Sequence, residues 1–338
     1  MSAAAFKRNL PVIGLGLLLA AGLFAPLVLK LSAPGFWTEV LLGGLMAGVL
    51  YSLVALGFVL IFKASGVFNF AQGAMVLFAA LSVARLSEKM PLWVAILLAV
   101  AIMIALAWVI ERVVLRPLVN QEGVALLMAT LGVTYFLDGF GQTIWGSDIY
   151  AIELGISREP VMVLDKVFDG GILINRDDVA AAIVAVILVG ALALFFQKTA
   201  TGRALRAVAD DHQAAQSIGI PLNRIWVIVW AVAGITAIVA GVIWGGKLGV
   251  QFSISLVALK ALPVVILGGF TSVPGAIVGG LIIGVGEKMA EVFLGPPLVK
   301  MFDLAGGGIE NWFAYMLALL FLLVRPQGLF GERHIDRV

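Results

Sequence analysis

The stretch Lys198–Asn223, KTATGRALRAVADDHQAAQSIGIPLN, decides how this chain is organised. It is polar and charged, and sequence apolar enough to lie in lipid flanks it on each side. The stretch is too long for a tight turn between two membrane helices and too short for a domain. We therefore predict a folded loop at one membrane surface, between two membrane-spanning helices.

Two short helices are predicted inside this loop. Residues 203–209 are rich in alanine, which favours helix. A second helix over Gln213–Ile218 is expected to stop at Gly219, because glycine commonly follows the last helical residue. This second helix carries three small or apolar side chains, Ala214, Ala215 and Ile218. They would form a compact knob that suits a groove on a partner protein. The alternative is a solvated connector.

The composition places the chain in a membrane. Of its 338 residues, 62% are hydrophobic and 12% are charged. A soluble domain is about 25% charged and about half apolar. Long apolar runs that contain Gly and Pro indicate helices rather than the alternating strands of a membrane barrel. The net charge is +2 and the basic residues form no patch, so no nucleic-acid partner is expected.

The apolar runs predict an all-α integral membrane protein, a polytopic helical bundle of about eight to ten transmembrane helices in one domain over residues 1–338. The predicted apolar segments are 10–29, 40–62, 74–83, 91–110, 124–145, 179–196, 225–245, 252–287 and 311–324. Placing both termini and the Lys198–Asn223 loop in the cytoplasm agrees with the positive-inside rule.

Glycines mark two places where helices are expected to approach closely or to break. Gly44 and Gly48 form a small-xxx-small pair, which lets two helices come close together. The run LGGFTSVPGAIVGG (Leu267–Gly280) predicts a broken or re-entrant segment. If this region crosses the membrane, ten crossings result; if it re-enters, eight do. The hinge candidates are Gly268, Gly269, Pro274 and Gly275.

The longest polar connection, residues 146–178, is then expected to lie on the outer side of the membrane, opposite the cytoplasm. Its seven acidic residues outnumber its three basic ones. Two apolar alternating runs flank Asp169-Gly170-Gly171, and this pattern predicts a β-hairpin.

Ionisable residues within or beside the apolar segments are functional candidates, because a charge in a bilayer is costly. They are Asp138, Lys260, Glu287 and Glu291. A pathway or proton-relay role is one hypothesis; the alternative is that the acids lie near helix ends and reach the interface. Thr130, Thr134 and Gln142 share a predicted helix with Asp138. They would form a polar stripe facing a pore, or hydrogen bonds that hold helices together.

Asn69 and Gln72 lie between two apolar segments. Their amides would either satisfy open backbone groups where a helix starts late or line a path for a zwitterionic solute. The candidates for a translocation path are therefore Asn69, Gln72, Thr134, Asp138 and Gln142.

No enzymatic or cofactor site is expected in this chain. It has no cysteine, and its two histidines, His212 and His334, have no partner at metal-ligand spacing. Gly241–Leu248 (GVIWGGKL) nearly matches a phosphate-binding loop, but Leu248 replaces the required hydroxyl residue and no strand precedes the run. An intramembrane enzyme is the weakest alternative.

Three blocks, in this order, resemble the LivH-type permease subunit of the branched-chain amino acid ABC importer family. They are GLMAGVLYSLVALGFVLIFKASGVFNFAQGAM (Gly44–Met75), TGRALRAVADDHQAAQSIGI (Thr201–Ile220) and LGGFTSVPGAIVGGLIIG (Leu267–Gly284). The middle block is also similar to the general coupling motif Glu-Ala-Ala-x-x-x-Gly of ABC importers. Here Gln213 replaces the glutamate, followed by Ala214, Ala215 and Gly219.

This resemblance implies a multi-pass permease of a bacterial or archaeal cytoplasmic membrane that imports a branched-chain amino acid or a related small polar solute. It would pair with a second permease subunit of the same family. Two ABC ATPase subunits, which hold the ATP and Mg²⁺, would dock on the Lys198–Asn223 loop. An extracytoplasmic solute-binding protein would deliver the solute, with residues 146–178 as its candidate docking surface. The alternative is a stand-alone secondary transporter or channel that couples ions through Asp138 and Glu287.

The residues expected to couple this chain to the ATPases lie in the middle block. They are Arg203, Arg206, Asp211, Gln213, Ala214, Ala215 and Gly219.

Overall fold

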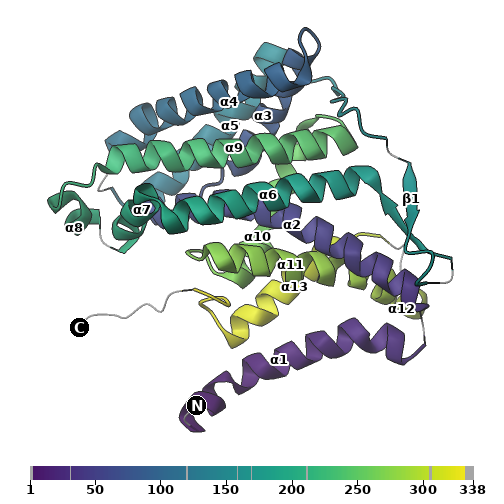
Figure 1. Ribbon diagram of the computed structural model, residues 1–338. Helices are drawn as coiled ribbons and strands as arrows, with labels where there is room; N and C mark the ends of the chain where they lie inside the picture. The colour runs from purple at the N-terminus through teal and green to yellow at the C-terminus, as the bar shows by residue number, and fades with distance from the viewer. Residues whose placement is uncertain are drawn as a thin grey trace.

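The computed structural model describes residues 3–30, 32–118, 121–157, 159–168, 170–210, 212–303 and 307–331. These residues are predominantly helical, and their sheet structure is one two-stranded hairpin. Most of the helices run along a common long axis (Figure 1). The predicted all-α polytopic membrane protein is therefore confirmed.

Five helices within the described ranges are long and apolar enough to cross a membrane, or six if the bent pair α10–α11 counts as one span. The five are α2 (Pro34–Ser65), α4 (Leu92–Val109) with its continuation to Leu118, α5 (Gly123–Trp145), α6 (Arg176–Lys198) and α9 (Leu222–Leu248). Shorter apolar helices are α1 (Ala3–Val28), α3 (Gln72–Ser87) and α13 (Ile309–Val324). The number of crossings, eight to ten, stays a prediction.

The other helices are short and lie at breaks or ends of the bundle. They are α7 (Ala200–Asp210), α8 (His212–Ser217), α10 (Val257–Gly268), α11 (Val273–Met289) and α12 (Gly295–Phe302). One-turn elements occur at Ile110–Leu115, Arg116–Leu118, Phe252–Leu256 and Ala290–Leu294.

The helices α2 and α9 form the centre of the bundle. Their most apolar windows are 72% and 67% buried, against 22–28% for α4, α5 and α6. A helix that is apolar on all sides, as α2 and α9 are, suits such a buried position. The less buried α4, α5 and α6 therefore turn most of their surface toward lipid or toward partner chains.

Four glycines let α2 and α11 pack backbone to backbone. A Cβ on Gly48 would lie 2.6 Å from the carbonyl oxygen of Gly280, and one on Gly284 would lie 2.5 Å from that of Gly44. Real Cβ atoms do not approach a backbone so closely, so only glycine, whose side chain is a hydrogen atom, fits at these positions. The predicted close approach at Gly44 and Gly48 is confirmed, and its partner is α11.

The predicted break in the glycine-rich run is a sharp corner, because α10 and α11 meet at 115°. Gly269 ends α10 with φ +106°, a backbone conformation that favours glycine. Ser272 then caps α11 by accepting a hydrogen bond from the Gly275 N–H, and Pro274 occupies the first turn. The Phe330 N–H donates a hydrogen bond to the Gly268 carbonyl, so residues 325–331 contact the corner between α10 and α11.

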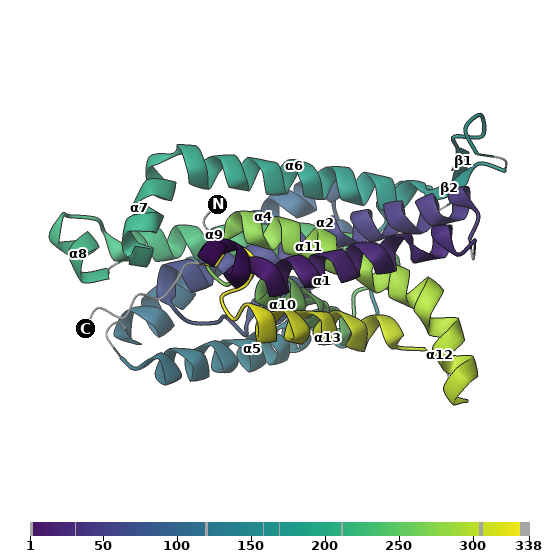
Figure 2. The same ribbon diagram turned by 90° about the horizontal axis from the view of Figure 1, so that it is seen from below.

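The two ends of the bundle differ in character. The start of α1, the helices α7 and α8, and the end of α13 lie toward the same end (Figures 1 and 2). The strands β1 (Pro160–Val163) and β2 (Ile172–Asn175) lie at the opposite end and pair antiparallel, with Val163 facing Ile172. The predicted hairpin is confirmed, although Asp169 itself lies outside the described residues. The assignment of these ends to the two sides of the membrane stays a prediction.

Candidate functional site

The loop that organises the sequence folds into α7 and α8, which project from one end of the bundle (Figure 2). The turn from α6 into α7 is tight. Gly202 packs directly against the backbone of Phe196, leaving no room for a Cβ. The Thr199 hydroxyl accepts a hydrogen bond from the Gly202 N–H and so begins α7. Helix α7 therefore leaves α6 in a defined direction rather than as a loose connector.

Helix α8 ends in a C-terminal cap at Gly219, as its glycine predicted. Gly219 has φ +86° and donates its N–H to the Gln216 carbonyl. The next N–H, of Ile220, donates to the Ala215 carbonyl. These two bonds together form a Schellman cap. The stop at Gly219 is thus confirmed.

The knob expected on α8 is only partly present. Ala214 is exposed and the Ile218 side chain is 74% exposed, so both face outward. Ala215 is only 2% exposed and packs into the core, so its predicted place on the outer face is wrong. Consecutive helix residues point about 100° apart, which prevents Ala214 and Ala215 from sharing one face. Asp211 and the side chain of Gln213 lie outside the described residues.

The two arginines predicted to couple this chain to an ATPase, Arg203 and Arg206, contact their own chain. The Arg206 guanidinium donates to the Phe196 carbonyl at 2.7 Å, and that of Arg203 donates to the Lys198 carbonyl at 3.4 Å. Both carbonyls belong to the last turn of α6, where a helix carries partial negative charge. The arginines therefore brace α7 against α6, and this fixes the position of α8.

Asn69 and Gln72 lie at a break between α2 and α3 deep inside the bundle, and both are fully buried. The Asn69 side-chain oxygen accepts the Ala71 N–H, as expected where a helix starts late. The Gln72 amide donates to the Ala233 carbonyl at 3.4 Å and occupies space left by Gly57. Its oxygen has no hydrogen-bond partner among the described residues.

The polar residues of α5 form one stripe next to this break. Thr130, Thr134, Asp138 and Gln142 follow at intervals of four residues, which places them on one side of the helix. The Thr130 hydroxyl lies 3.4 Å from both the Phe70 nitrogen and the Phe68 carbonyl oxygen. The structure therefore brings the stripe to the break that holds Asn69 and Gln72. One oxygen of Asp138 has no hydrogen-bond partner within the described part of the chain.

Glu287 lies in a buried polar cluster away from this stripe. Its carboxylate is 5% exposed, accepts from the Tyr51 hydroxyl at 3.0 Å and pairs with Lys260 at 3.2 Å. Lys260 lies on α10, Glu287 on α11 and Tyr51 on α2, so the cluster joins three helices. Tyr51 has no sequence signal for this role, because 236 positions separate it from Glu287.

We expect Lys260→Met to lower the stability of the bundle by about 2 kcal/mol, because a buried carboxylate then loses its charged partner. Thermal unfolding of the purified chain measures this loss. The double variant Lys260→Met, Glu287→Gln is expected to recover part of it, since the unpaired charge is gone. Lys288→Met is the matched control, because Lys288 pairs with Glu291 in an exposed position. Equal losses for Lys260→Met and Lys288→Met would contradict a stabilising role for the cluster.

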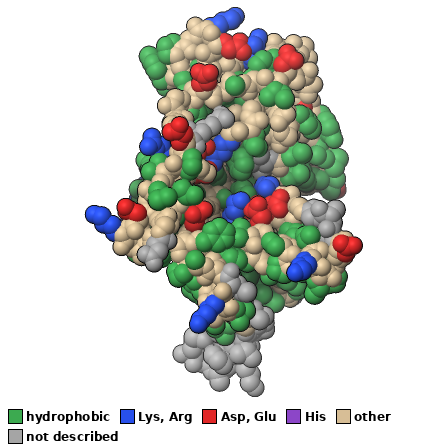
Figure 3. All heavy atoms as spheres, turned by 90° about the vertical axis from the view of Figure 1, so that its right-hand side faces the viewer, with side chains coloured by type: hydrophobic (Ala, Val, Ile, Leu, Met, Phe, Trp, Pro, Cys, Tyr) green, Lys and Arg blue, Asp and Glu red, His purple; other side chains and the backbone are tan. Residues whose placement is uncertain are grey.

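The end of the molecule with the hairpin is polar. Acidic and basic side chains are interspersed across it, with hydrophobic surface at its flanks (Figure 3). Asp148, Glu159 and Asp165 are among its exposed acids. The hairpin is tied to the bundle by α2, because the Leu173 N–H donates to the Glu39 carboxylate. This end therefore offers a firm polar surface opposite α7 and α8.

A sequence model of the family described as "Branched-chain amino acid transport system / permease component" matches residues 40–325. LivH of Salmonella typhimurium, a high-affinity branched-chain amino acid transport system permease protein, is 28% identical over 90% of this chain and 98% of its own length. BraD of Pseudomonas aeruginosa, with the same description, is 28% identical over 89% of this chain and 98% of its own. The fructose import permease FruF of Bifidobacterium longum is 28% identical over 70% of this chain and 66% of its own.

Proposed function

This chain belongs to the family of branched-chain amino acid transport permeases, and on that premise we propose that it is one half of the membrane channel of an ATP-driven importer. The other half is a second permease subunit of the same family. As a multi-pass transport subunit, the chain moves a solute and leaves the hydrolysis of ATP, with its Mg²⁺, to partner subunits. The membrane is the cytoplasmic membrane of a bacterium or archaeon.

The conformational changes that accompany ATP hydrolysis in the ATPase subunits reach this chain through α7 and α8. The observation that carries this proposal is the exposed tip formed by Ala214, Ile218 and the Gly219 cap, at the end of a helix pair braced by Arg203 and Arg206. A rigid tip with one exposed isoleucine suits insertion into a groove on an ATPase subunit. Movement of that groove then pushes on the end of α6 through the Gly202–Phe196 contact.

The second permease subunit packs on α5. The outward side of this helix carries Gly132, Tyr135, Gly139 and Gln142, all exposed in the single chain. Hydrocarbon offers no hydrogen-bond partner for the exposed Gln142 amide, whereas the small residues Gly132 and Gly139 allow another helix to approach closely. The solute path therefore lies along this stripe, with Asn69 and Gln72 behind it.

The solute is an amino acid, of the branched-chain type, delivered by a binding protein that docks on the hairpin end. The support for the solute is the description of the family and of two relatives. The support for the docking surface is its position opposite the ATPase end (Figure 1) and the excess of acidic over basic residues in the segment 146–178. Long-range attraction from such a surface speeds the encounter with a basic partner.

Transport by the reconstituted complex tests this function. We expect uptake of radiolabelled leucine into proteoliposomes only when the second permease, both ATPases, the binding protein and internal ATP-Mg²⁺ are all present. Vesicles loaded with a nonhydrolysable ATP analogue are the control. Uptake driven by an ion gradient without ATPase subunits would overturn the proposal and favour the stand-alone secondary transporter.

A further inference from the structure

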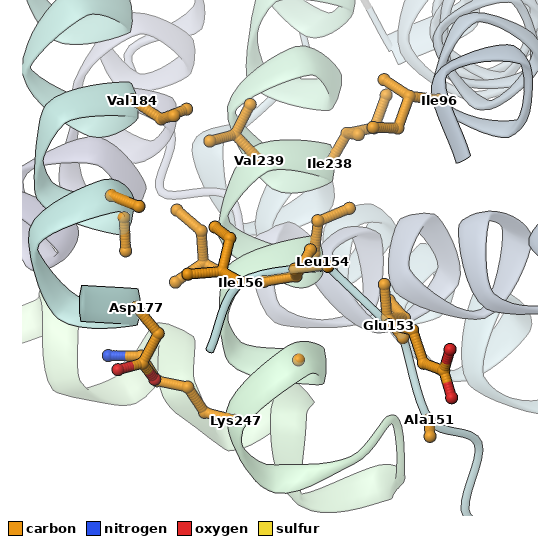
Figure 4. A pocket seen from close by; sticks show the side chains of 17 residues that line it. Ile96, Ala151, Glu153, Leu154, Ile156, Asp177, Val184, Ile238, Val239 and Lys247 are labelled. Atoms are coloured by element: carbon orange, nitrogen blue, oxygen red, sulfur yellow. The ribbon is translucent and has the colours of Figure 1, made fainter. Parts of the chain in front are cut away.

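A cavity of 560 Å³ lies on the far side of α9 from the predicted solute path. Helices α4, α6 and α9 enclose it, and residues 151–156 cover its outer end (Figure 4). Its wall is built mainly from branched aliphatic side chains, Ile96, Val184, Ile238, Val239, Val242 and Ile243. We call it the lateral cleft.

The lateral cleft is separate from the solute path because α9 stands between them. On its opposite side α9 packs against α3, where Gly241 contacts the Val76 carbonyl and Ala80. The polar stripe of α5 lies beyond α3, so none of its residues reaches the cleft. The transport function leaves this cavity unexplained.

The walls of the lateral cleft belong to helices that face lipid. Helix α4 packs along α9, while α6 packs mainly on α2 and α7, so the two walls diverge from each other. Leu97 on α4 and Ile187 on α6 are 62% and 65% exposed on the same helices. The aliphatic part of the cleft, between Ile96, Val184 and Val239, offers no side-chain polar partner to hold water, whereas hydrocarbon gains dispersion contacts with its wall. The occupant is therefore an acyl chain.

The charged residues at the outer end of the cleft favour one kind of lipid headgroup. Asp177 and Lys247 lie together at this end of the cleft, whereas the Glu153 carboxylate points away from it (Figure 4). The Lys247 ammonium forms an ion pair with Asp178. Among the described residues near this end, Lys247 is thus paired with Asp178 and Lys288 with Glu291, whereas Asp177 has no ion pair, so its carboxylate favours a cationic group. An anionic headgroup would be repelled.

The geometry points to one bound phospholipid with a primary-amine headgroup. Its acyl chain lies along α9 between Val184 and Ile96, and its ammonium lies against Asp177. The cover formed by residues 151–156 is firm enough to hold it, because Ile152 packs on Gly245 and Tyr150 bridges to Val250.

Lipid retention tests this inference. The chain is reconstituted in nanodiscs made from equal amounts of phosphatidylethanolamine and phosphatidylglycerol, and is then extracted and washed in mild detergent. Native mass spectrometry measures the number and the identity of the lipids that stay bound to it. We expect one retained lipid per chain, with phosphatidylethanolamine enriched about fivefold, the effect of roughly one charge near a membrane surface. Asp177→Asn is expected to retain a lipid but to lose this enrichment, and Asp165→Asn, which lies outside the cleft, is expected to keep it.

A filling variant tests the cleft itself. Val184→Trp places an indole in the cavity and is expected to abolish retention. Val186→Trp is the control, because Val186 is exposed, lies outside the cleft lining and points about 200° away from Val184 on the same helix, and it is expected to preserve retention. Equal retention in these two variants, preference for phosphatidylglycerol, or a wild-type chain that retains no lipid would each overturn the inference. If Val184→Trp fails to fold, the enrichment of phosphatidylethanolamine on the wild-type chain and the loss of that enrichment in Asp177→Asn still test the proposed lipid site.

Discussion

Gly48→Ala and Gly284→Ala are each expected to prevent stable folding of the bundle. The added methyl group at either position would meet backbone atoms of the facing helix, at 2.6 Å from the Gly280 oxygen or 2.5 Å from the Gly44 oxygen. A backbone cannot rotate aside as a side chain can, so α2 and α11 must move apart along their whole contact. Overpacking a core costs about 1–3 kcal/mol, and a central helix pair is expected to reach the upper end of that range.

The neighbouring glycine provides the control for this experiment. Gly43 has no atom within 4 Å of its would-be Cβ. Gly43→Ala is therefore expected to be neutral or to gain up to about 1 kcal/mol from helix propensity. Thermal unfolding and the yield of monodisperse protein separate the variants. Equal unfolding temperatures for Gly43→Ala and Gly48→Ala would show that the helices do not depend on this contact.

The second large effect is expected at the tip of α8. Ile218→Asp places a charge on the exposed side chain that we assign to the ATPase groove, and Gly219→Asp adds a charge at the cap next to it. Losing a central contact typically costs more than about 2 kcal/mol of binding, or about thirtyfold in affinity. We expect either variant, like deletion of residues 211–219, to abolish solute-stimulated ATP hydrolysis while membrane insertion persists.

Gly219→Asn isolates the effect of the charge, because asparagine and aspartate are similar in shape and both tolerate the left-handed conformation. It is expected to keep most of the stimulation. The readout is ATP hydrolysis by the reconstituted complex with and without solute-loaded binding protein. Stimulation that survives both Ile218→Asp and Gly219→Asp would contradict coupling through α8.

Local sequence signals predicted local structure well. The hairpin followed from two alternating runs around Gly170 and Gly171, which have φ of +90° and +68°. The cap at Gly219 and the corner at Leu267–Gly280 followed from glycine and proline in the same way. The burial of Ala215 was not predicted, because it depends on which side of a short helix meets α9 and α7.

The candidate site was predicted in part. Spacing alone placed Thr134, Asp138 and Gln142 on one side of α5, and this stripe is present. Spacing did not predict that Thr130 would meet the break at Phe68–Phe70, because that contact joins residues about sixty positions apart. Nor did it predict that Arg203 and Arg206 would bind carbonyls of α6.

The sequence by itself determined that this protein lies in a membrane, that it is helical, and that a polar loop with a glycine stop interrupts it. These properties depend on composition and on patterns within a few turns. Only the tertiary structure decided which glycines touch, which carboxylate is paired with Lys260, and where a cleft opens beside α9. In lipid nearly every surface is apolar, so hydrophobicity does not select the partner of a helix; packing shape and a few polar contacts between distant residues do.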